Sequence, residues 1–298
     1  MSISQYQIFV KAVEQGSFTK AAAQLGFTQS GVSHAISALE GELGLTLLHR
    51  DRSGISLTAD GRQLLPYLQQ MCNLQHRMEE TAKDLKGMNT GLVRVGTFTS
   101  VSVQWMPHIL KDFRQLYPHI DFEILPGDYG QIEEWIAQGR VDCGFLRLPT
   151  MRQLDGFLLH RDQLMVLLPP GHPLADRRVF PRKALEQYPF IQLEEGGDYE
   201  IGAVLDKLRV KPRVQYTVKE DQTLLAMVSN GLGISIMPEL MTHHSPYPVV
   251  LLPLEQPFYR SIGLCLKDRS SCSLSTRRFM EHVKEWVAEH PGACSTEE

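Results

Sequence analysis

The N-terminal part of the fold is decided by FTKAAAQLGFTQSGVSHAISALE at residues 18–40. Ser17, just before it, is a good N-cap for a short alanine-rich helix over 18–25, and Gly26 is the residue type favoured beyond a helix end. The small alanine side chains let a neighbouring helix approach closely. We therefore expect a short helix here that packs tightly against a second one.

The rest of this stretch predicts that second helix, with Thr28 or Ser30 as its N-cap. Its apolar residues recur at i, i+4 and i+7 and are Val32, Ile36 and Leu39. Its opposite face carries short polar side chains, which are Gln29, Ser30, Ser33, His34 and Ser37. Two helices joined by a tight turn, with a polar face on the second, have the geometry with which a helix enters the DNA major groove.

Further elements flank this pair on both sides. Residues 4–15 have helical apolar spacing and end at Gly16, and two short extended runs around Gly54 predict a β-hairpin wing. Arg50 and Arg52 lie on that wing, where contact with phosphate or the minor groove is sterically easy. An inert scaffold is the alternative, because four Lys and Arg within residues 1–60 are outnumbered by five Asp and Glu.

A long helix is expected to follow from the N-cap Thr58, since no glycine occurs between Gly61 and Gly87. Pro66 should bend it or lie near its start. Apolar residues with 4-3-7-4-3 spacing form a seam of the coiled-coil kind, which consists of Leu64, Leu68, Met71, Met78, Ala82 and Leu85. The polar opposite face favours pairing with a second subunit over packing against the chain's own domains.

Beyond the linker at 87–91 the pattern changes to alternating strands and helices, which indicates an α/β architecture. The expected strands are 92–96, 120–125, 142–146, 163–168, 190–193, 214–218, 234–237 and 259–266. The expected helices between them include 105–117, 131–138 and 221–230.

Several of these motifs together resemble the LysR-type transcriptional regulators, bacterial proteins with an N-terminal DNA-binding signature. The resemblance rests on residues 18–40, on LGLTLLHR at 43–50 and on LTADG at 57–61. In the C-terminal half it rests on LVRVG at 92–96, GRVDCGF at 139–145, GHPLA at 171–175 and VSNGLGISIMP at 228–238. It extends over nearly the whole chain.

The resemblance implies a fold class with three parts. These are an N-terminal all-α winged helix-turn-helix over 1–58, a linker and dimerisation helix over 59–87, and an α/β, periplasmic-binding-protein-like effector domain over 91–298. The effector domain would have one lobe of residues 91–162 and 267–298 and another of 163–266. Dimers through the linker helix that associate into tetramers, an indirect contact with RNA polymerase, and activation as well as repression are also implied.

The DNA contacts would come from the second helix of the helix-turn-helix and from the wing. The candidates are Thr28, Gln29, Ser30, Ser33, His34, Ser37, Arg50 and Arg52. Glutamine and serine side chains reach base edges and phosphates, and a neutral His34 can donate or accept one hydrogen bond.

The effector is expected between the lobes, where strand ends and helix N-termini favour anions. Arg147 follows a strand, and its planar fork suits a carboxylate, although a structural salt bridge is an alternative. Thr99 and Ser100 either contact the ligand or merely cap a helix, and Tyr129 either covers the ligand or is a surface aromatic. Gln192, Gln222 and Thr223 are further candidates from the other lobe. The expected ligand is a small organic anion.

Composition and the other motifs argue against an enzyme, a metal site, a cofactor or a membrane protein. The five cysteines are scattered without Cys-x-x-Cys, and His243-His244 has no metal-ligand spacing. GLG at 231–233 fits a helix stop rather than a phosphate loop, and Cys143 lies in an apolar strand. The N-terminus has no export signal and no apolar stretch spans a membrane, so we expect a cytoplasmic protein and not an exported solute-binding module. The net charge of −4 requires that any DNA affinity be local.

Overall fold

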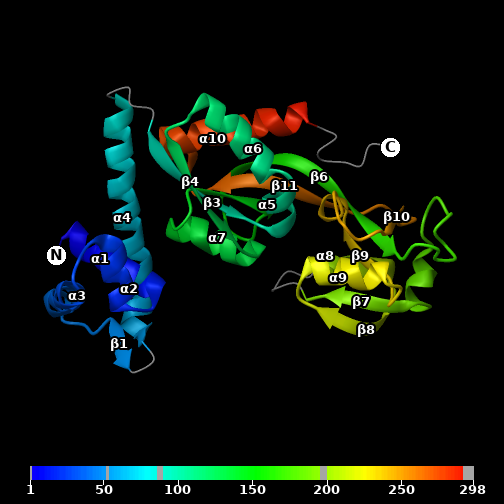
Figure 1. The fold of residues 1–298 in the computed structure, drawn as a ribbon, viewed down its shortest axis with the longest axis horizontal. Coiled ribbons are helices and arrows are strands. Elements are labelled where there is room, and N and C mark those ends of the chain that lie inside the picture. Colours follow the sequence, from blue (N-terminus) through cyan, green and yellow to red (C-terminus); the bar gives the residue numbers. More distant parts are fainter. Residues whose placement is uncertain (1, 52–53, 86–89, 195–199, 291–298) are drawn as a thin grey trace.

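The computed structural model describes residues 2–51, 54–85, 90–194 and 200–290. The chain is elongated, with the N-terminal unit at one end and the two parts of the C-terminal domain arranged in a row (Figure 1). Most of the predicted linker at 87–91 lies outside the described residues. Arg52 and Cys294 also lie outside them. None of the described helices is long and apolar enough to cross a membrane.

The N-terminal unit begins with three helices whose ends follow the capping signals. They are α1 (Ile3–Gln15), α2 (Phe18–Leu25) and α3 (Gln29–Leu43). Ser2, Ser17 and Thr28 each accept a hydrogen bond from a backbone N–H of the helix that they precede. Glycines in the left-handed conformation end all three helices, at positions 16, 26 and 44. The predicted helix-turn-helix is therefore present.

The three helices enclose a small apolar core, and the wing closes one side of it. Phe9, Val32 and Ile36 are fully buried in this core, and the alanines of α2 let the helices approach. The wing is the antiparallel pair β1 (Leu48–Asp51) and β2 (Gly54–Leu57). It is held against the turn after α1, because the Ile55 N–H donates to the carbonyl of Gly16.

The long helix α4 (Ala59–Leu85) starts where the wing ends. The Thr58 hydroxyl accepts the N–H of Gly61 at 2.9 Å, and Pro66 lies inside the helix about two turns from its start. The predicted apolar seam divides into two sets here. Leu64 and Leu68 pack into the core of the N-terminal unit, whereas Met71 and Met78 are exposed.

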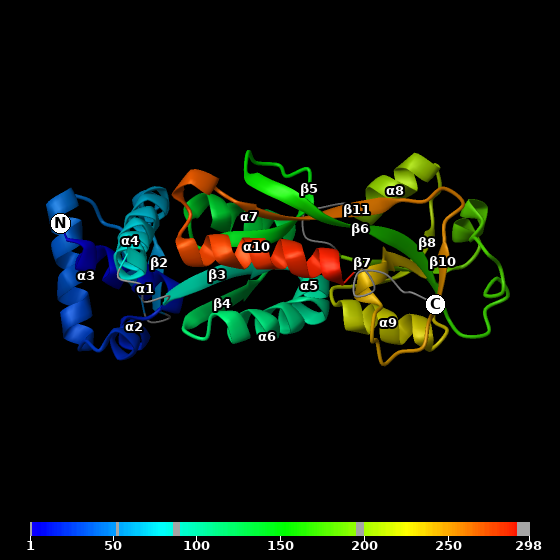
Figure 2. The ribbon, with the colours of Figure 1, turned by 90° about the horizontal axis from the view of Figure 1, so that it is seen from above.

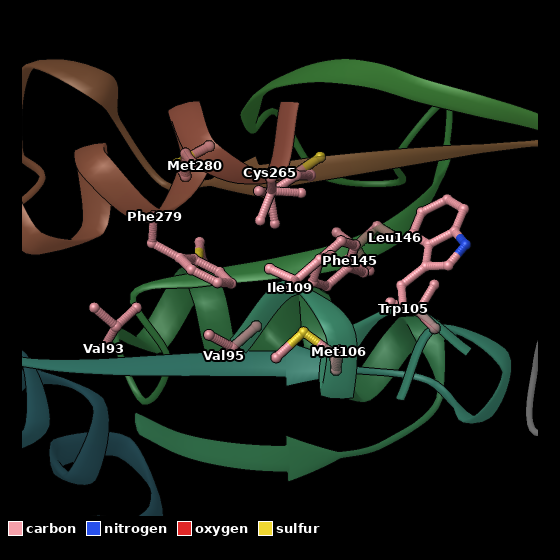
Figure 3. Packing of buried hydrophobic residues seen from close by; sticks show 14 of the residues in the cluster. Val93, Val95, Trp105, Met106, Ile109, Phe145, Leu146, Cys265, Phe279 and Met280 are labelled. Atoms are coloured by element: carbon pink, nitrogen blue, oxygen red, sulfur yellow. The ribbon is translucent and has the colours of Figure 1, made fainter. Parts of the chain in front are cut away.

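The first lobe of the C-terminal domain is a sheet covered by helices on both faces (Figure 2). Its strands are β3 (Gly91–Thr97), β4 (Ile120–Pro126) and β5 (Cys143–Leu148), with β3 parallel to both of the others. Its helices are α5 (Thr99–Gln104), α6 (Met106–Leu116), α7 (Tyr129–Gln138) and α10 (Leu274–Glu289). Apolar side chains from α6 and α10 meet those of β3 and β5 between the layers (Figure 3).

The second lobe combines strands and short helices around two apolar clusters. Its strands are β7 (Pro189–Leu193), β8 (Arg213–Val218), β9 (Ser235–Pro238) and β10 (Val250–Pro253). Its helices are α8 (Glu200–Leu208) and α9 (Asp221–Ser229), together with the 3-10 turns η1 (Arg182–Glu186) and η2 (Glu239–Met241). A third 3-10 turn, η3 (Arg269–Ser271), follows the last strand of the chain.

Two long antiparallel strands cross between the lobes. They are β6 (Asp155–Leu168) and β11 (Tyr259–Leu266), paired from Tyr259 with Gln163 to Leu266 with Asp155. One end of this ribbon joins β5 of the first lobe, and the other end of β6 joins β9 and β10 of the second. The α/β architecture with two lobes is as expected, but β6 begins eight residues before the predicted start at 163.

The contact between α4 and the wing leads to a stability prediction. A Cβ atom at Gly61 would lie 2.1 Å from the carbonyl oxygen of Leu47, so Gly61→Ala should destabilise the protein by about 1–3 kcal/mol through overpacking. The control is Gly41→Ala in α3, where a Cβ meets nothing within 4 Å; this change should stabilise by about 0.5–1 kcal/mol. Denaturant unfolding of the full chain measures both, and equal effects of the two substitutions would contradict the prediction.

Candidate functional site

The polar face of α3 lies on the surface of the N-terminal unit. Gln29, Ser30, His34 and Ser37 are exposed, and Ser33 is half-buried. The Thr28 hydroxyl accepts the Gly31 N–H at 3.1 Å, so part of its hydrogen-bonding capacity is already occupied within the protein. A helix face of this kind, held at the start of the helix, can present amide and hydroxyl groups to base edges.

Arg50 joins the wing to this face rather than extending from the wing. Its guanidinium donates to the hydroxyls of Ser33 at 3.2 Å and Ser37 at 3.1 Å, and it forms an ion pair with Glu40 at 3.3 Å. It also lies 5.1 Å from the centre of the Phe18 ring. The structure thus joins three of the predicted DNA-binding residues through the hydrogen bonds of one guanidinium. Arg52 lies outside the described residues.

A second candidate site is a cavity of about 390 Å³ between the two lobes. The first lobe contributes side chains from the ends of β3 and β4 and from the start of α7, and the second contributes the ends of β7 and β8 and the starts of α8 and α9. The lining residues used below are Phe98, Thr99, Asp128, Tyr129, Leu193, Glu200, Lys219, Asp221, Met241 and Arg260. We call this cavity the interlobe cleft.

Arg260 of β11 forms the polar floor of the interlobe cleft. It is only 4% exposed and pairs with the fully buried Asp162 on the neighbouring strand, at 2.6 Å. It also donates to the hydroxyls of Ser100 at 2.7 Å and Tyr129 at 3.1 Å. Asp162 accepts the Leu240 N–H at 3.0 Å. One ion pair on the crossing strands therefore holds groups from both lobes.

Two further carboxyl groups reach the cleft from the second lobe. Glu200 is buried at the start of α8 and interacts electrostatically with Arg260. Burial raises the pKa of Asp221 above its ordinary value, and a hydrogen bond with the Thr99 side chain and the charge of Arg260 oppose this shift. Thr99 of the first lobe is thus close enough to Asp221 of the second to lower the pKa of its carboxyl.

The structure decides some alternatives that the sequence left open. Thr99 and Ser100 do not cap α5, whose N-cap is Phe98 without a side-chain hydrogen bond; they contact Asp221 and Arg260 instead. Tyr129 is half-buried, and its ring packs edge-on against Phe98 with centroids 4.9 Å apart.

Of the predicted ligand residues, Thr99 and Tyr129 line the interlobe cleft, whereas Ser100 is fully buried and the remaining four lie elsewhere. Arg147 lies within β5, paired with Ile262, and not after the strand as expected; its guanidinium is 5.9 Å from the centre of the Tyr129 ring. Gln192 lines a separate cavity beside α8, and Gln222 and Thr223 line a shallow depression beside Tyr247.

Sequence reasoning missed Arg260, Asp162, Glu200, Lys219 and Asp221. Asp221 directly precedes Gln222 and Thr223, the two residues predicted from the start of α9. The sequence therefore indicated the correct helix but not the side chain that lines the cleft. Arg260 had a signal, because an arginine inside an otherwise apolar strand needs a buried partner. Its partner is 98 residues away in the chain, which no local pattern reveals.

The alternatives involving catalysis and metals have little support in the geometry. Cys143 is fully buried, and burial raises its pKa well above the ordinary value, so the thiol stays protonated and is a poor nucleophile. Gly231 adopts the left-handed conformation just after Asn230, the C-cap of α9, as expected for a helix stop. Within the described residues, no three histidine, cysteine or acidic side chains gather closely enough to hold a metal ion.

Two family models match the chain. Residues 3–62 match the bacterial regulatory helix-turn-helix protein of the lysR family, and residues 86–288 match the LysR substrate binding domain. The regulator YvbU of Bacillus subtilis, described as uncharacterized, is 33% identical over 96% of this chain and 98% of its own length. The probable regulator LrrA of Synechococcus elongatus is 35% identical over 97% of this chain and 98% of its own length.

Solved structures show the same fold at lower identity. A full-length OxyR variant from Pseudomonas aeruginosa has a TM-score of 0.76 at 21% identity, covering 96% of this chain and 94% of its own. Full-length CbnR in complex with its target DNA has a TM-score of 0.68 at 20% identity, covering 96% of this chain and 99% of its own. The family and these relatives are transcriptional regulators and not enzymes. This chain belongs to the LysR family, as a DNA-binding transcriptional regulator with a substrate-binding domain.

Proposed function

We propose that a small organic molecule with a carboxylate group binds in the interlobe cleft and controls how the protein binds its operator and activates transcription. The observation that carries this proposal is the position of Arg260, which lines the cleft, donates to Tyr129 of the first lobe and is paired with Asp162, whose carboxylate accepts the Leu240 N–H of the second lobe. A ligand there changes the relative free energies of lobe arrangements only if it binds one of them better.

The carboxylate would bind at Arg260 and Lys219 rather than at Arg147. Both of these cations line the cleft, whereas Arg147 is not among its lining residues and lies 5.9 Å from the centre of the Tyr129 ring. The rings of Phe98 and Tyr129 and the side chains of Leu193 and Met241 provide apolar walls for the carbon skeleton. The cleft lies between the proposed lobes, residues 91–162 with 267–298 and residues 163–266.

The proposed assembly is a dimer through α4 within residues 59–87, with dimers pairing into a tetramer in the cytoplasm. Its support is an exposed apolar stripe on α4 at 4-3-4 spacing, consisting of Tyr67, Met71, Leu74 and Met78. This stripe replaces the predicted seam, of which Leu64 and Leu68 pack into the N-terminal core. Such spacing is that of a helix that pairs with a second helix. The assembly would act on RNA polymerase indirectly, by altering the bending of promoter DNA.

The proposed DNA contact inserts the start of α3 into the major groove, with Gln29, Ser30 and His34 near the bases. Arg50 would approach phosphate while it orients Ser33 and Ser37. Pairing through α4 would place two such helices on one DNA site.

Arg50→Ala should weaken binding to all DNA, because a phosphate contact carries no sequence information. We expect a loss of about tenfold at low salt and a salt slope shallower by about one unit, both for a duplex selected from a random library and for unselected DNA. Fluorescence anisotropy over a salt series measures both quantities. Lys11→Ala is the control, since Lys11 pairs with Glu14 on α1.

His34→Ala gives the contrasting result if His34 reads a base. The selected duplex should then lose about 1–3 kcal/mol of binding free energy while unselected DNA is bound as before. An equal loss on both duplexes would assign His34 to the phosphate backbone instead.

The double substitution Met71→Lys and Met78→Lys should weaken dimerisation at least tenfold, because it places charges in the proposed helix seam. Sedimentation equilibrium of the full chain gives the dissociation constant. The control is Glu79→Lys, which adds positive charge at an exposed position beside the stripe. An unchanged dissociation constant for the double variant would show that α4 does not form the dimer contact.

A further inference from the structure

We propose that the second lobe carries a further DNA-binding surface, which contacts the phosphate backbone of DNA outside the site bound by α3. Exposed cations at the end of the lobe away from the interlobe cleft form this surface. We call it the basic tip; it consists of Arg177, Arg178, Arg182, Lys183, Lys207, Arg209, Lys211 and Arg213. Such a contact needs neither an effector in the cleft nor a dimer through α4.

Two segments of the chain, residues 176–183 and 206–213, meet at the basic tip. The Arg182 guanidinium donates to the carbonyl of Leu208 at 3.4 Å and so joins η1 to the end of α8. Helix α8 begins at Glu200, which lines the interlobe cleft, and it ends at Leu208. The basic tip therefore lies at the end of α8 opposite to the cleft, and its cations are not part of the cleft lining.

The charge of the two segments is opposite in sign to that of the whole chain. They contain eight basic and two acidic residues, whereas the net charge of the chain is −4. No ion pair joins any of the eight cations to another described residue. The nearby carboxylates of Glu186 and Glu255 accept backbone N–H groups instead. Eight exposed positive charges without anionic partners in the described chain are an electrostatic site for an external polyanion.

Arg209 belongs to the basic tip although its backbone position favours glycine. It lies directly after α8 with a φ of +53°, in the left-handed region. Its N–H donates to the carbonyl of Asp206 at 3.0 Å, and the Val210 N–H donates to that of Leu205 at 3.2 Å, which is the Schellman pattern of a helix end. Glycine takes the left-handed position after α1, α2, α3 and α7, because a Cβ is disfavoured there. An exposed arginine at such a cost points to a functional role for its side chain.

The composition of the basic tip fits nucleic acid better than a protein partner. Protein interfaces have aromatic and aliphatic side chains at their centre and few lysines, whereas protein–DNA interfaces are polar and strongly positive. Val179 is the one large exposed apolar residue in the two segments. The protein is a DNA-binding regulator, so a polyanion with about one negative charge per 1.7 Å is present whenever it acts.

The shape of the chain lets one DNA molecule meet both ends. Figure 1 shows the N-terminal unit and the second lobe at opposite ends, with β1 of the wing and β8 on the same side of the first lobe. DNA that continues along this side beyond the site of α3 would meet the second lobe. Phosphate contacts there would add affinity and salt dependence without adding sequence preference.

The first test removes three charges from the basic tip of the full-length protein. The tip variant combines Lys183→Gln, Lys207→Gln and Lys211→Gln, and the control variant removes three exposed charges from the first lobe by Lys111→Gln, Arg114→Gln and Lys284→Gln. Fluorescence anisotropy over a salt series compares the selected site in a duplex of about 30 base pairs with the same site inside about 100 base pairs.

The two variants should differ on the long duplex only. There the tip variant should bind about tenfold more weakly than the control variant, with a salt slope shallower by about two to three units. Any gain from several N-terminal units on one long duplex is common to both variants, and equal binding to the short duplex shows that both are folded. Equal binding of the two variants to the long duplex would overturn the inference, and so would an equal loss by the tip variant on both duplexes.

A second test separates the charge of Arg209 from its structural role. Arg209→Gly should raise the melting temperature, because glycine adopts the left-handed conformation freely, and should make the salt slope on the long duplex shallower by about one unit. Arg209→Lys keeps both the charge and the disfavoured backbone position, so it should bind the long duplex like the unaltered protein. The same long-duplex affinity and salt slope for the glycine and lysine variants would contradict a phosphate contact at Arg209.

Discussion

The buried ion pair between Arg260 and Asp162 is the interaction on which the C-terminal domain depends. Its two members lie opposite each other on β11 and β6, the strands that cross between the lobes. Each member also holds a neighbouring element, since Arg260 contacts α5 and α7 and Asp162 accepts the Leu240 N–H of η2. Removing either partner would leave an uncompensated charge in the interior, a change that typically costs about 3–5 kcal/mol. The same pair includes a residue that lines the interlobe cleft, so the stability of the crossing strands and the polar character of the cleft have one origin.

Helix α7 relates this floor to the N-terminal half of the molecule. Its first residue, Tyr129, accepts a hydrogen bond from Arg260, and Gly139 at its other end accepts one from Asn73 of α4 (Figure 1). A Cβ at Gly139 would clash with the Asn73 side chain, so the glycine permits this close approach. One rigid helix therefore touches the cleft at one end and the long helix at the other. The two hydrogen bonds make α7 a contiguous connection between the cleft and α4.

The sequence was informative wherever a local pattern determined the structure. Ser17, Thr28 and the glycines at 16 and 26 placed the helices of the N-terminal unit correctly, because caps and left-handed C-termini are local. The strand at 259–266 was predicted with its observed ends. The cleft was harder, because the partner of Arg260 is brought to it only by the antiparallel register of β6 and β11. The same reason explains why Leu64 and Leu68 could be assigned to a seam, when tertiary packing places them in the core of the N-terminal unit, where α4 contacts α1.

In the N-terminal unit, the positions of the charged side chains are more informative than the number of acidic and basic residues. Five acidic residues against four basic ones over residues 1–60 argued against a DNA-binding surface. Glu40, however, is turned inward; one of its oxygens accepts the N–H groups of Leu47 and Leu48 at 2.7 and 3.1 Å, and the other pairs with Arg50. The Glu40 carboxylate thus holds the wing against α3. Its ion pair with Arg50 also positions the Arg50 guanidinium beside Ser33 and Ser37. An acidic residue that lowers the net charge of the unit is therefore what orients a cation beside the polar face of α3, since local placement and not net charge decides where a phosphate can bind.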